Sequence, residues 1–241
     1  MKDAKVRLYV DQPLGVGQSV LLSRDQAQYL FSVMRLGAGA AVTVFNGRDG
    51  AWRAVIAEAS RKAGVAVCEA QTAPQTDPPD LWLMFAPLKK AQTEFVVQKA
   101  VEMGVRRILP VASDFTNAER FRVDRAQAHA IEAAEQCGAV FVPEVSELSK
   151  LDKVLDAWSP DRQLMFCDEV RAGERPAALV HPGPWAILIG PEGGFSDAER
   201  ARLAAMAHGM SLGPRILRAE TAVVAAMALW QAALGDWRGQ V

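Results

Sequence analysis

The sequence has few of the residues that build metal sites and disulfide frameworks. It holds three cysteines, Cys68, Cys137 and Cys167, and three histidines among 241 residues, with no C-x-x-C spacing. An odd number of scattered cysteines predicts buried thiols rather than disulfides, and so few histidines argue against a cluster of metal ligands. We therefore expect no metal in the functional site.

Long apolar runs and nucleotide fingerprints are also missing. No run of eighteen apolar residues occurs, and the start of the chain has no apolar core of a signal peptide, so we expect a cytoplasmic protein without a membrane span. No P-loop or G-x-G-x-x-G pattern occurs at the glycine-rich loops, which disfavours a nicotinamide oxidoreductase. A net charge of −1 argues against a protein that coats nucleic acid non-specifically.

The first 74 residues have the pattern of a small β-barrel with one helix. Apolar and polar residues alternate, and turn residues separate strands expected over residues 42–45, 51–56 and 64–68. Ser23 and Gln26 form a capping box, which predicts a helix over residues 23–34. Three prolines between Ala73 and Asp80 then indicate a linker.

Residues 75–241 have the pattern of an α/β domain. Strands are expected over residues 81–85, 107–111, 141–145, 163–167, 185–189 and 210–212. Helices are expected over residues 93–103, 124–137, 150–158 and 219–234, with another beginning at the capping box of Ser196 and Glu199. Such alternation predicts a mostly parallel sheet with helices on both faces.

Two loops follow the last two expected strands. The first is Gly190-Pro-Glu-Gly-Gly-Phe195, and the second is Gly213-Pro-Arg-Ile-Leu-Arg218. Glycines let a backbone approach a ligand closely just outside the carboxyl end of a strand, so the two loops together could form a pocket of backbone amides. Taken alone, the first loop could equally be a tight connection between a strand and a helix.

The two loops resemble, nearly residue for residue, the cofactor loops of bacterial 16S ribosomal RNA (uracil-N3) methyltransferases of the SPOUT class. Similar runs at residues 89–104, 107–110, 131–138 and 211–222 extend the resemblance over most of residues 81–235. It implies a C-terminal SPOUT domain with a trefoil knot over residues 75–241 and an N-terminal PUA-like, RNA-binding β-barrel over residues 1–74. It also implies S-adenosylmethionine as cofactor, a homodimer, and 16S rRNA in the small ribosomal subunit as partner. A catalytically silent RNA-binding assembly factor of the same fold is the alternative.

The resemblance places the cofactor in the two loops. Apolar walls are expected from Leu188, Ile189, Leu212, Ile216 and Leu217. Polar contacts are expected near Gly190, Pro191, Gly193, Gly194, Gly213 and Thr221, because a few placed amides fix a ligand among apolar walls. The loop over residues 85–88 would close one side.

Methylation of uracil N3 requires loss of the N3 proton. Arg218 is our candidate for stabilising charge on the uracil oxygens, and Glu132 is our candidate proton acceptor. Arg218 could instead pair with Glu220 or Glu192 and merely organise the loop. Glu132 shares a helix face with Gln136, and that face could simply be solvated.

The chain departs from the family at three positions. Tyr29 stands where a histidine is usual, Ala40 where an aspartate is usual, and Phe115 where an arginine is usual. If that arginine meets RNA phosphate, a nearby cation must replace it, and the candidates are Arg120, Arg122 and Arg125.

The helix that ends the domain is apolar nearly all round. Residues 223–230 carry this pattern, which predicts burial either in a dimer interface or in the core.

Overall fold

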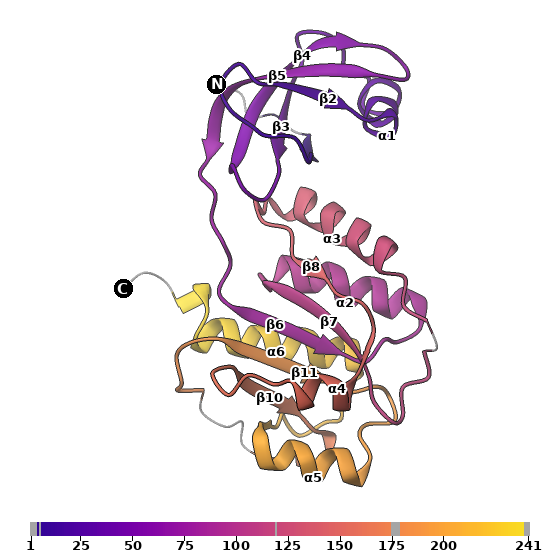
Figure 1. Cartoon of the computed structure of the whole chain (residues 1–241), viewed down its shortest axis with the longest axis vertical. Coiled ribbons are helices and arrows are strands. Elements are labelled where there is room, and N and C mark those ends of the chain that lie inside the picture. Colours follow the sequence, from indigo (N-terminus) through magenta and orange to yellow (C-terminus); the bar gives the residue numbers. More distant parts are fainter. Residues whose placement is uncertain (1–3, 5, 119, 175–178, 239–241) are drawn as a thin grey trace. The chain divides into compact units, whose positions relative to one another are not determined.

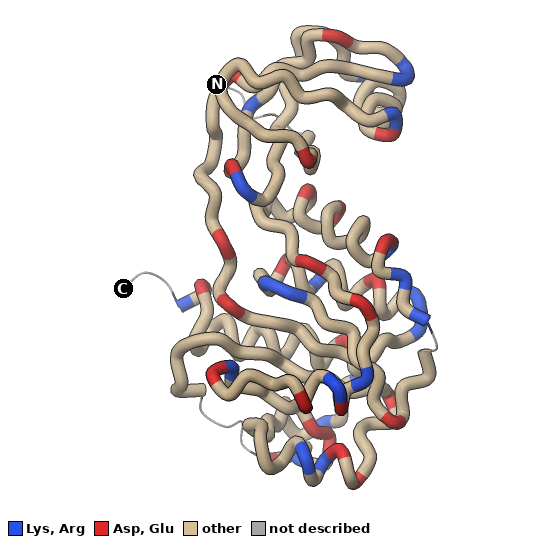
Figure 2. Tube along the Cα trace, viewed as in Figure 1, with Lys and Arg blue, Asp and Glu red and all other residues tan. Residues whose placement is uncertain are grey.

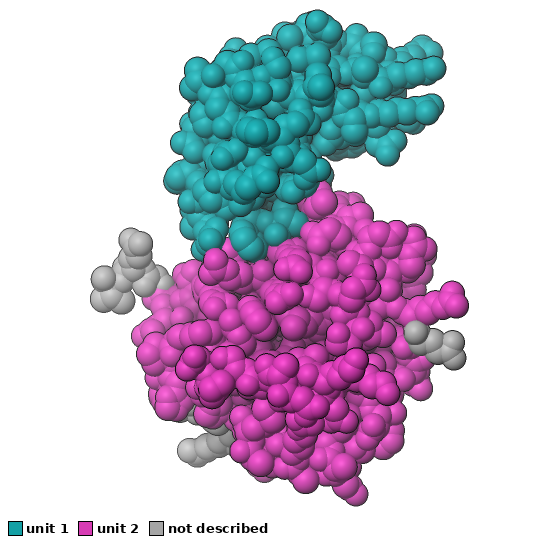
Figure 3. All heavy atoms as spheres, viewed as in Figure 1, with its two compact units in different colours: residues 1–77, 134–142 teal, residues 78–133, 143–241 magenta. Residues whose placement is uncertain are grey.

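A computed structural model describes residues 4, 6–118, 120–174 and 179–238 of the chain (Figure 1). The chain divides into two compact units (Figure 3). The N-terminal unit contains residues 1–77 and 134–142, and the C-terminal unit contains residues 78–133 and 143–241. No pattern in the sequence predicts that residues 134–142 group with the N-terminal residues.

The N-terminal unit is built on one five-stranded sheet with the order β1-β3-β4-β5-β2. The strands are β1 (Arg7–Tyr9), β2 (Ser19–Leu22), β3 (Ala41–Phe45), β4 (Ala51–Ala59) and β5 (Gly64–Ala73). β1 is parallel to β3, and the other pairs are antiparallel. One apolar core, which includes Val20, Leu30 and Val44, fills the unit.

Its helix confirms the predicted start but not the predicted form. Ser23 and Gln26 make the capping box that opens α1 (Arg24–Ala27). From Gln28 to Val33 the chain continues as a π-helix, in which the Met34 N–H donates to the carbonyl of Tyr29 at 2.9 Å. The expectation of one regular helix over residues 23–34 is therefore wrong in its second half, because the hydrogen bonds there span five residues.

The C-terminal unit is the predicted α/β domain. Its parallel sheet has the order β12-β10-β11-β6-β7-β8, and β9 (Ser149–Lys150) pairs with β7. The strands are β6 (Leu81–Phe85), β7 (Arg107–Ala112), β8 (Glu144–Val145), β10 (Gln163–Cys167), β11 (Trp185–Ile189) and β12 (His208–Met210). The helices are α2 (Lys90–Glu102), α3 (Val123–Cys137), α4 (Leu151–Asp156), α5 (Asp197–Met206) and α6 (Ala219–Ala233), and α3 runs across the boundary between the units.

The bounds of several strands differ from the sequence prediction, and the differences at β12 and β8 follow directly from strand pairing. The last strand ends at Met210 rather than at residue 212, because Met210 pairs with Cys167, the final residue of β10. Residues 211 and 212 therefore have no β10 residue left to pair with. The strand expected over residues 141–145 shrinks to Glu144–Val145, the two residues that pair with β7.

Helices pack on β11 through alternate residues. Ala186 and Leu188 of β11 lie in one apolar cluster with Leu151 and Leu155 of α4 and Leu203 of α5. Helix α6 packs on β11 and on α2. Because successive strand residues face opposite sides of a sheet, Leu188 and Ile189 point in opposite directions.

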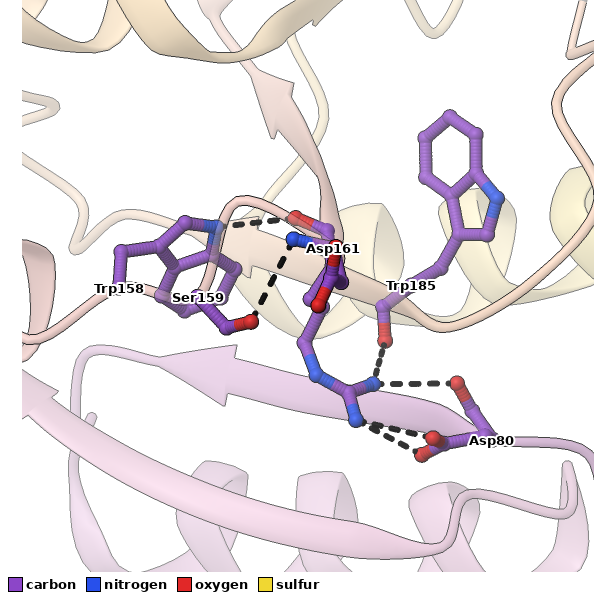
Figure 4. Close-up of polar contacts among 6 residues, drawn as sticks. Asp80, Trp158, Ser159, Asp161 and Trp185 are labelled. Carbon is purple, nitrogen blue, oxygen red and sulfur yellow. Dashed lines mark hydrogen bonds and ion pairs between the residues drawn. The ribbon is translucent and has the colours of Figure 1, made fainter.

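Arg162 joins the amino ends of two central strands (Figure 4). Its guanidinium donates to the Asp80 carboxylate at 2.9 and 3.0 Å and to the Trp185 carbonyl at 3.0 Å. The same group lies 3.6 Å from the centre of the Trp82 ring. These contacts hold β6 and β11 together at their amino ends, whereas the glycine loops follow the carboxyl ends of the strands.

The described residues include no helix with the length and apolar character that crossing a membrane requires. The same residues contain no group of three or more His, Cys, Asp or Glu side chains arranged to hold a metal ion.

Candidate functional site

A cavity of about 270 Å³ opens at the carboxyl ends of β10, β11 and β12. Three loops and the start of α6 form its walls. From the end of β10 and the loop after it come Cys167, Asp168, Glu169 and Ala172, and from the end of β11 and the loop after it come Ile189, Gly190, Pro191 and Glu192. The remaining wall consists of Met210, Leu212, Gly213, Arg215, Ile216, Leu217, Arg218, Ala219 and Ala222.

The loop after β11 is shaped by contacts that exclude side chains at its glycines. A β-carbon on Gly190 would lie 2.6 Å from the Phe195 ring. Phe195 is buried, and its ring lies edge-on 5.1 Å from the ring of Phe166. Gly194 has a φ of +69°, which glycine adopts at little cost. Ser196 and Glu199 then make the predicted capping box at the start of α5.

Glu199 also fastens the turn after β7 to this loop. Its buried carboxylate accepts from the N–H of Asp114 and from the N–H of Ser196, both at 2.9 Å. The Ser196 hydroxyl donates to the Asp114 carboxylate at 2.6 Å. Phe115 lies against Gly193, where an added β-carbon would stand 3.2 Å from the β-carbon of Phe115. Phe115 therefore packs on the glycine loop and does not supply a cation.

The loop after β10 is the part of the site that the sequence analysis missed. Arg200 of α5 holds this loop by pairing with Asp168 at 3.3 Å and with Glu169 at 2.5 Å. Burial raises the pKa of the Cys167 thiol to about 12, so Cys167 contributes a neutral wall. A signal was present, because Asp168 and Glu169 directly follow a buried strand whose carboxyl end faces the ligand side of a parallel sheet.

The loop after β12 contributes the cations. Gly213 has a φ of +107° and no atom within 4 Å of its β-carbon position, and its N–H donates to the Ser211 hydroxyl at 3.3 Å. Arg218 is the N-cap of α6 and is exposed. None of the ion pairs in the described part of the chain involves Arg218, so the alternative pairing with Glu220 or Glu192 is not formed.

The structure brings together most of the residues expected to bind a cofactor. Seven of them line the cavity together with Arg218: Ile189, Gly190, Pro191, Leu212, Gly213, Ile216 and Leu217. Leu188 does not, because the strand turns its side chain into the core formed with α4 and α5. Gly193, Gly194 and Thr221 also lie outside the lining, and the two glycines instead shape the loop.

Glu132 lies apart from this cavity. Its side chain, 65% exposed on α3, has one carboxylate oxygen 3.6 Å from Nδ1 of His129. His129 lines a different cavity, together with residues of α2 and α3. The two residues predicted to be catalytic are therefore not brought to one cavity.

Comparisons with known proteins agree with this geometry. Residues 75–231 match the model of the RNA methyltransferase domain, and residues 22–67 match the RNA methyltransferase PUA domain. The chain belongs to this RNA methyltransferase family. The resemblance found in the sequence is thereby confirmed.

Relatives of the same family match along most of the chain. The ribosomal RNA small subunit methyltransferase E of Rickettsia conorii is 26% identical over 92% of this chain and 93% of its own length. That of Synechocystis is 28% identical over 92% of this chain and 76% of its own length. The crystal structure of the Neisseria gonorrhoeae protein of this name, bound to S-adenosyl methionine, superposes with a TM-score of 0.87 at 28% identity, over 96% of this chain and 99% of that one. The predicted SPOUT-type fold is therefore confirmed, whereas the threading of its trefoil knot stays a prediction.

Proposed function

We propose that this protein methylates N3 of a specific uridine in the 16S ribosomal RNA of the small subunit, with S-adenosylmethionine as methyl donor. The observation that carries the proposal is the cavity at the ends of β10, β11 and β12, in a chain whose fold matches a family member bound to that cofactor. The relatives' names specify small-subunit ribosomal RNA as the substrate of those proteins.

The cavity has the chemistry that S-adenosylmethionine requires. Ile189, Leu212 and Leu217 offer apolar surface to adenine, and Gly190 and Gly213 bring backbone into the lining of the cavity. Glu192 is exposed at the cavity and forms no ion pair with a described residue, so it can face the positive groups of the cofactor. When bound, the cofactor supplies a methyl group activated by a sulfonium. The observed volume of about 270 Å³ is close to the lower end of ligand pockets, roughly 300 Å³.

Arg218 stabilises the charge that develops on uracil in this proposal. The N3–H bond breaks and its proton leaves to a base or to solvent. The new bond joins N3 to the methyl carbon as the bond between that carbon and the sulfonium sulfur breaks, and the sulfur leaves as a neutral thioether. A guanidinium near O2 or O4 of uracil lowers the energy of the charge that develops as the proton leaves. Arg218 is suited to this because it lines the cavity and has no ion pair with any described residue. Glu132 lines no part of this cavity, so its role as acceptor rests on the family resemblance alone.

The rest of the chain has supporting roles in the proposal. Residues 1–74 serve as the RNA-binding PUA-like domain, and residues 75–241 as the methyltransferase domain. The protein acts in the cytoplasm, where ribosomal subunits are assembled, and it works as a homodimer. The apolar character of α6 supports the dimer, since Leu229 remains 39% exposed although Val223, Met227 and Trp230 are buried.

Transfer of a labelled methyl group tests the proposal. The full chain is incubated with labelled S-adenosylmethionine and small subunits from a strain that lacks this methyltransferase. Label should appear in 16S RNA, and S-adenosylmethionine at about 100 times its dissociation constant should stabilise the fold by about 2.7 kcal/mol, whereas NAD should not. Stabilisation by NAD, or no label in RNA, would refute it.

A further inference from the structure

A second cavity, also of about 270 Å³, lies in the C-terminal unit and has no part in the site described above. Its floor is apolar and includes Pro87, Leu88, Val97 and Phe121. Its rim carries four cations, Lys90, Arg120, Arg122 and Arg125. Figure 2 shows Lys and Arg positions gathered at the N-terminal end of α3. Cations above an apolar floor interact with an anion more strongly than cations surrounded by water.

Two of the four cations are free to meet a ligand. Arg125 lies 3.6 Å from Glu94, the one carboxylate among the described lining residues, and Arg122 pairs with Asp124 at 2.6 Å. Lys90 and Arg120 are exposed and form no ion pair with any described residue. The rim therefore keeps an excess of positive charge.

The start of α2 adds to this field. α2 is 13 residues long, its N-cap Lys89 makes no side-chain capping bond, and its first turn contains no acidic residue. Lys90 and Thr93 of that first turn line the cavity. Because the N-terminus of a helix carries partial positive charge, an anion here would meet the helix end and the side-chain cations together.

The second cavity lies just beyond the end of β6, the strand that pairs with β11. Phe85 pairs with Ile189 in the sheet, and the Ala86 N–H donates to the Ile189 carbonyl at 3.1 Å. Ile189 lines the first cavity, and Pro87, the residue after Ala86, lines the second. The two cavities thus adjoin the ends of neighbouring strands.

We propose that the second cavity binds a backbone phosphate of the RNA strand whose uridine enters the first cavity. This inference rests on the proposed function. Lys90 and Arg120 hold the phosphate, and the cavity thereby provides the positive charge that Phe115 does not supply. Phosphate contacts of this kind position an RNA without reading its sequence.

The test compares Lys90→Gln/Arg120→Gln with a control, Lys153→Gln, in the full chain. Lys153 is an exposed cation of the same unit that lines neither cavity. Filter binding of unmodified 16S RNA, without cofactor, is measured from low to high salt. The double variant should bind RNA several-fold more weakly. The negative slope of log association constant against log salt concentration should become shallower by about 0.7 for each phosphate that the protein no longer neutralises. Its KM for RNA in methyl transfer should rise at unchanged kcat.

The control should behave as wild type, and S-adenosylmethionine binding should be unaltered in both variants. Unchanged RNA affinity and salt slope in the double variant would overturn the proposal, as would an equal decrease of affinity in Lys153→Gln. A third arm titrates inorganic phosphate. If the double variant loses phosphate binding but keeps RNA binding, the cavity is a small-anion site and the proposal is wrong. Because RNA binding is read without cofactor, the result does not depend on whether methyl transfer occurs.

Discussion

Gly194 lies directly against the carboxylate of Glu169, so that a β-carbon at position 194 would overlap Oε1 of Glu169. Arg200 holds that carboxylate at 2.5 Å, which prevents it from moving aside freely. The φ of +69° at Gly194 adds a second reason for glycine. A glycine at position 194 therefore lets the loop after β11 pack closely against the loop after β10.

Gly194→Ala should abolish the thermal shift that S-adenosylmethionine produces. The positive φ alone should cost about 1–2 kcal/mol of folding free energy, and the overlap with Glu169 should displace the loop that lines the cavity. The control is Gly138→Ala, because Gly138 has a φ of +83° but no atom near its β-carbon position. The control should lose a similar amount of stability and keep the shift. A normal shift in Gly194→Ala would contradict this account of the loop.

Arg218→Lys should lower turnover and leave cofactor binding nearly intact. Lysine keeps one charge but lacks the planar fork of donors, and the interaction that it cannot make is strongest in the transition state. Such interactions are typically worth about 2.7–4 kcal/mol, or roughly a hundred- to thousand-fold in rate. The measurement is single-turnover methylation at saturating cofactor, together with calorimetric binding. The control is Arg215→Lys, because Arg215 is a second exposed cation that lines the cavity. Its turnover and its cofactor binding should both be close to those of the wild type.

If Arg218→Lys instead loses cofactor binding at an unchanged saturated rate, Arg218 organises the loop rather than the charge on uracil. An equal decrease of the rate in Arg215→Lys would mean that the total charge of the cavity, and not the position of Arg218, determines the rate.

One thiol of three should react in the native protein. Cys137 is exposed, whereas Cys68 and Cys167 are buried. Burial raises the pKa of Cys68, and it raises that of Cys167 from 9.0 to about 12, so neither buried thiol supplies reactive thiolate near neutral pH. The unfolded chain loses these protons at lower pH than the folded chain, so stability should decline as pH rises from about 9 towards 12. Counting the reactive thiols with a chromogenic disulfide reagent, with and without denaturant, checks the prediction on reactivity. Rapid labelling of all three cysteines in the native protein would contradict it.

Leu229→Asp should shift the protein from dimer towards monomer. Leu229 is the exposed apolar residue of α6, and a carboxylate there would have to lose its water at an interface. Sedimentation of the full chain at tens of micromolar, where a specific interface of standard size is normally populated, is the measurement. Val16→Asp, at another exposed apolar residue, is the control. If the wild-type chain is itself a monomer at these concentrations, α6 does not form a dimer interface and the prediction is wrong.

The central elements of the fold were predicted closely from the sequence, because their signals are local. Buried strands such as Gln163–Cys167 and Trp185–Ile189 are short apolar runs between turns, and the structure has them with the same bounds. The capping box at Ser196 determines the start of α5 for the same reason. Non-local features were not predictable, since the short β8 and the end of β12 depend on how far their partner strands extend.

The site was predicted in part. The two glycine loops carry their own signal, so Gly190 and Gly213 were found, and both line the cavity. The loop after β10 has no sequence signal other than its position after a buried strand. Its place in the cavity depends on the pairing of Asp168 with Arg200, which are 32 residues apart in the sequence. Leu188 lies in the core and not in the lining, and the sequence could not show this, because a fully buried strand is apolar on both faces.

The chemical identity of the methylated nucleoside tests most directly whether this protein methylates N3 of uridine in 16S RNA. The full chain and S-adenosylmethionine are reacted with unmodified small subunits, and the 16S RNA is digested to nucleosides and analysed by chromatography with mass detection. We expect the wild type to form one new nucleoside, N3-methyluridine, and Arg218→Lys to form much less of it. A methyl group on carbon 5 of uracil, on a ribose oxygen or on another base, or the absence of any new nucleoside, would contradict it.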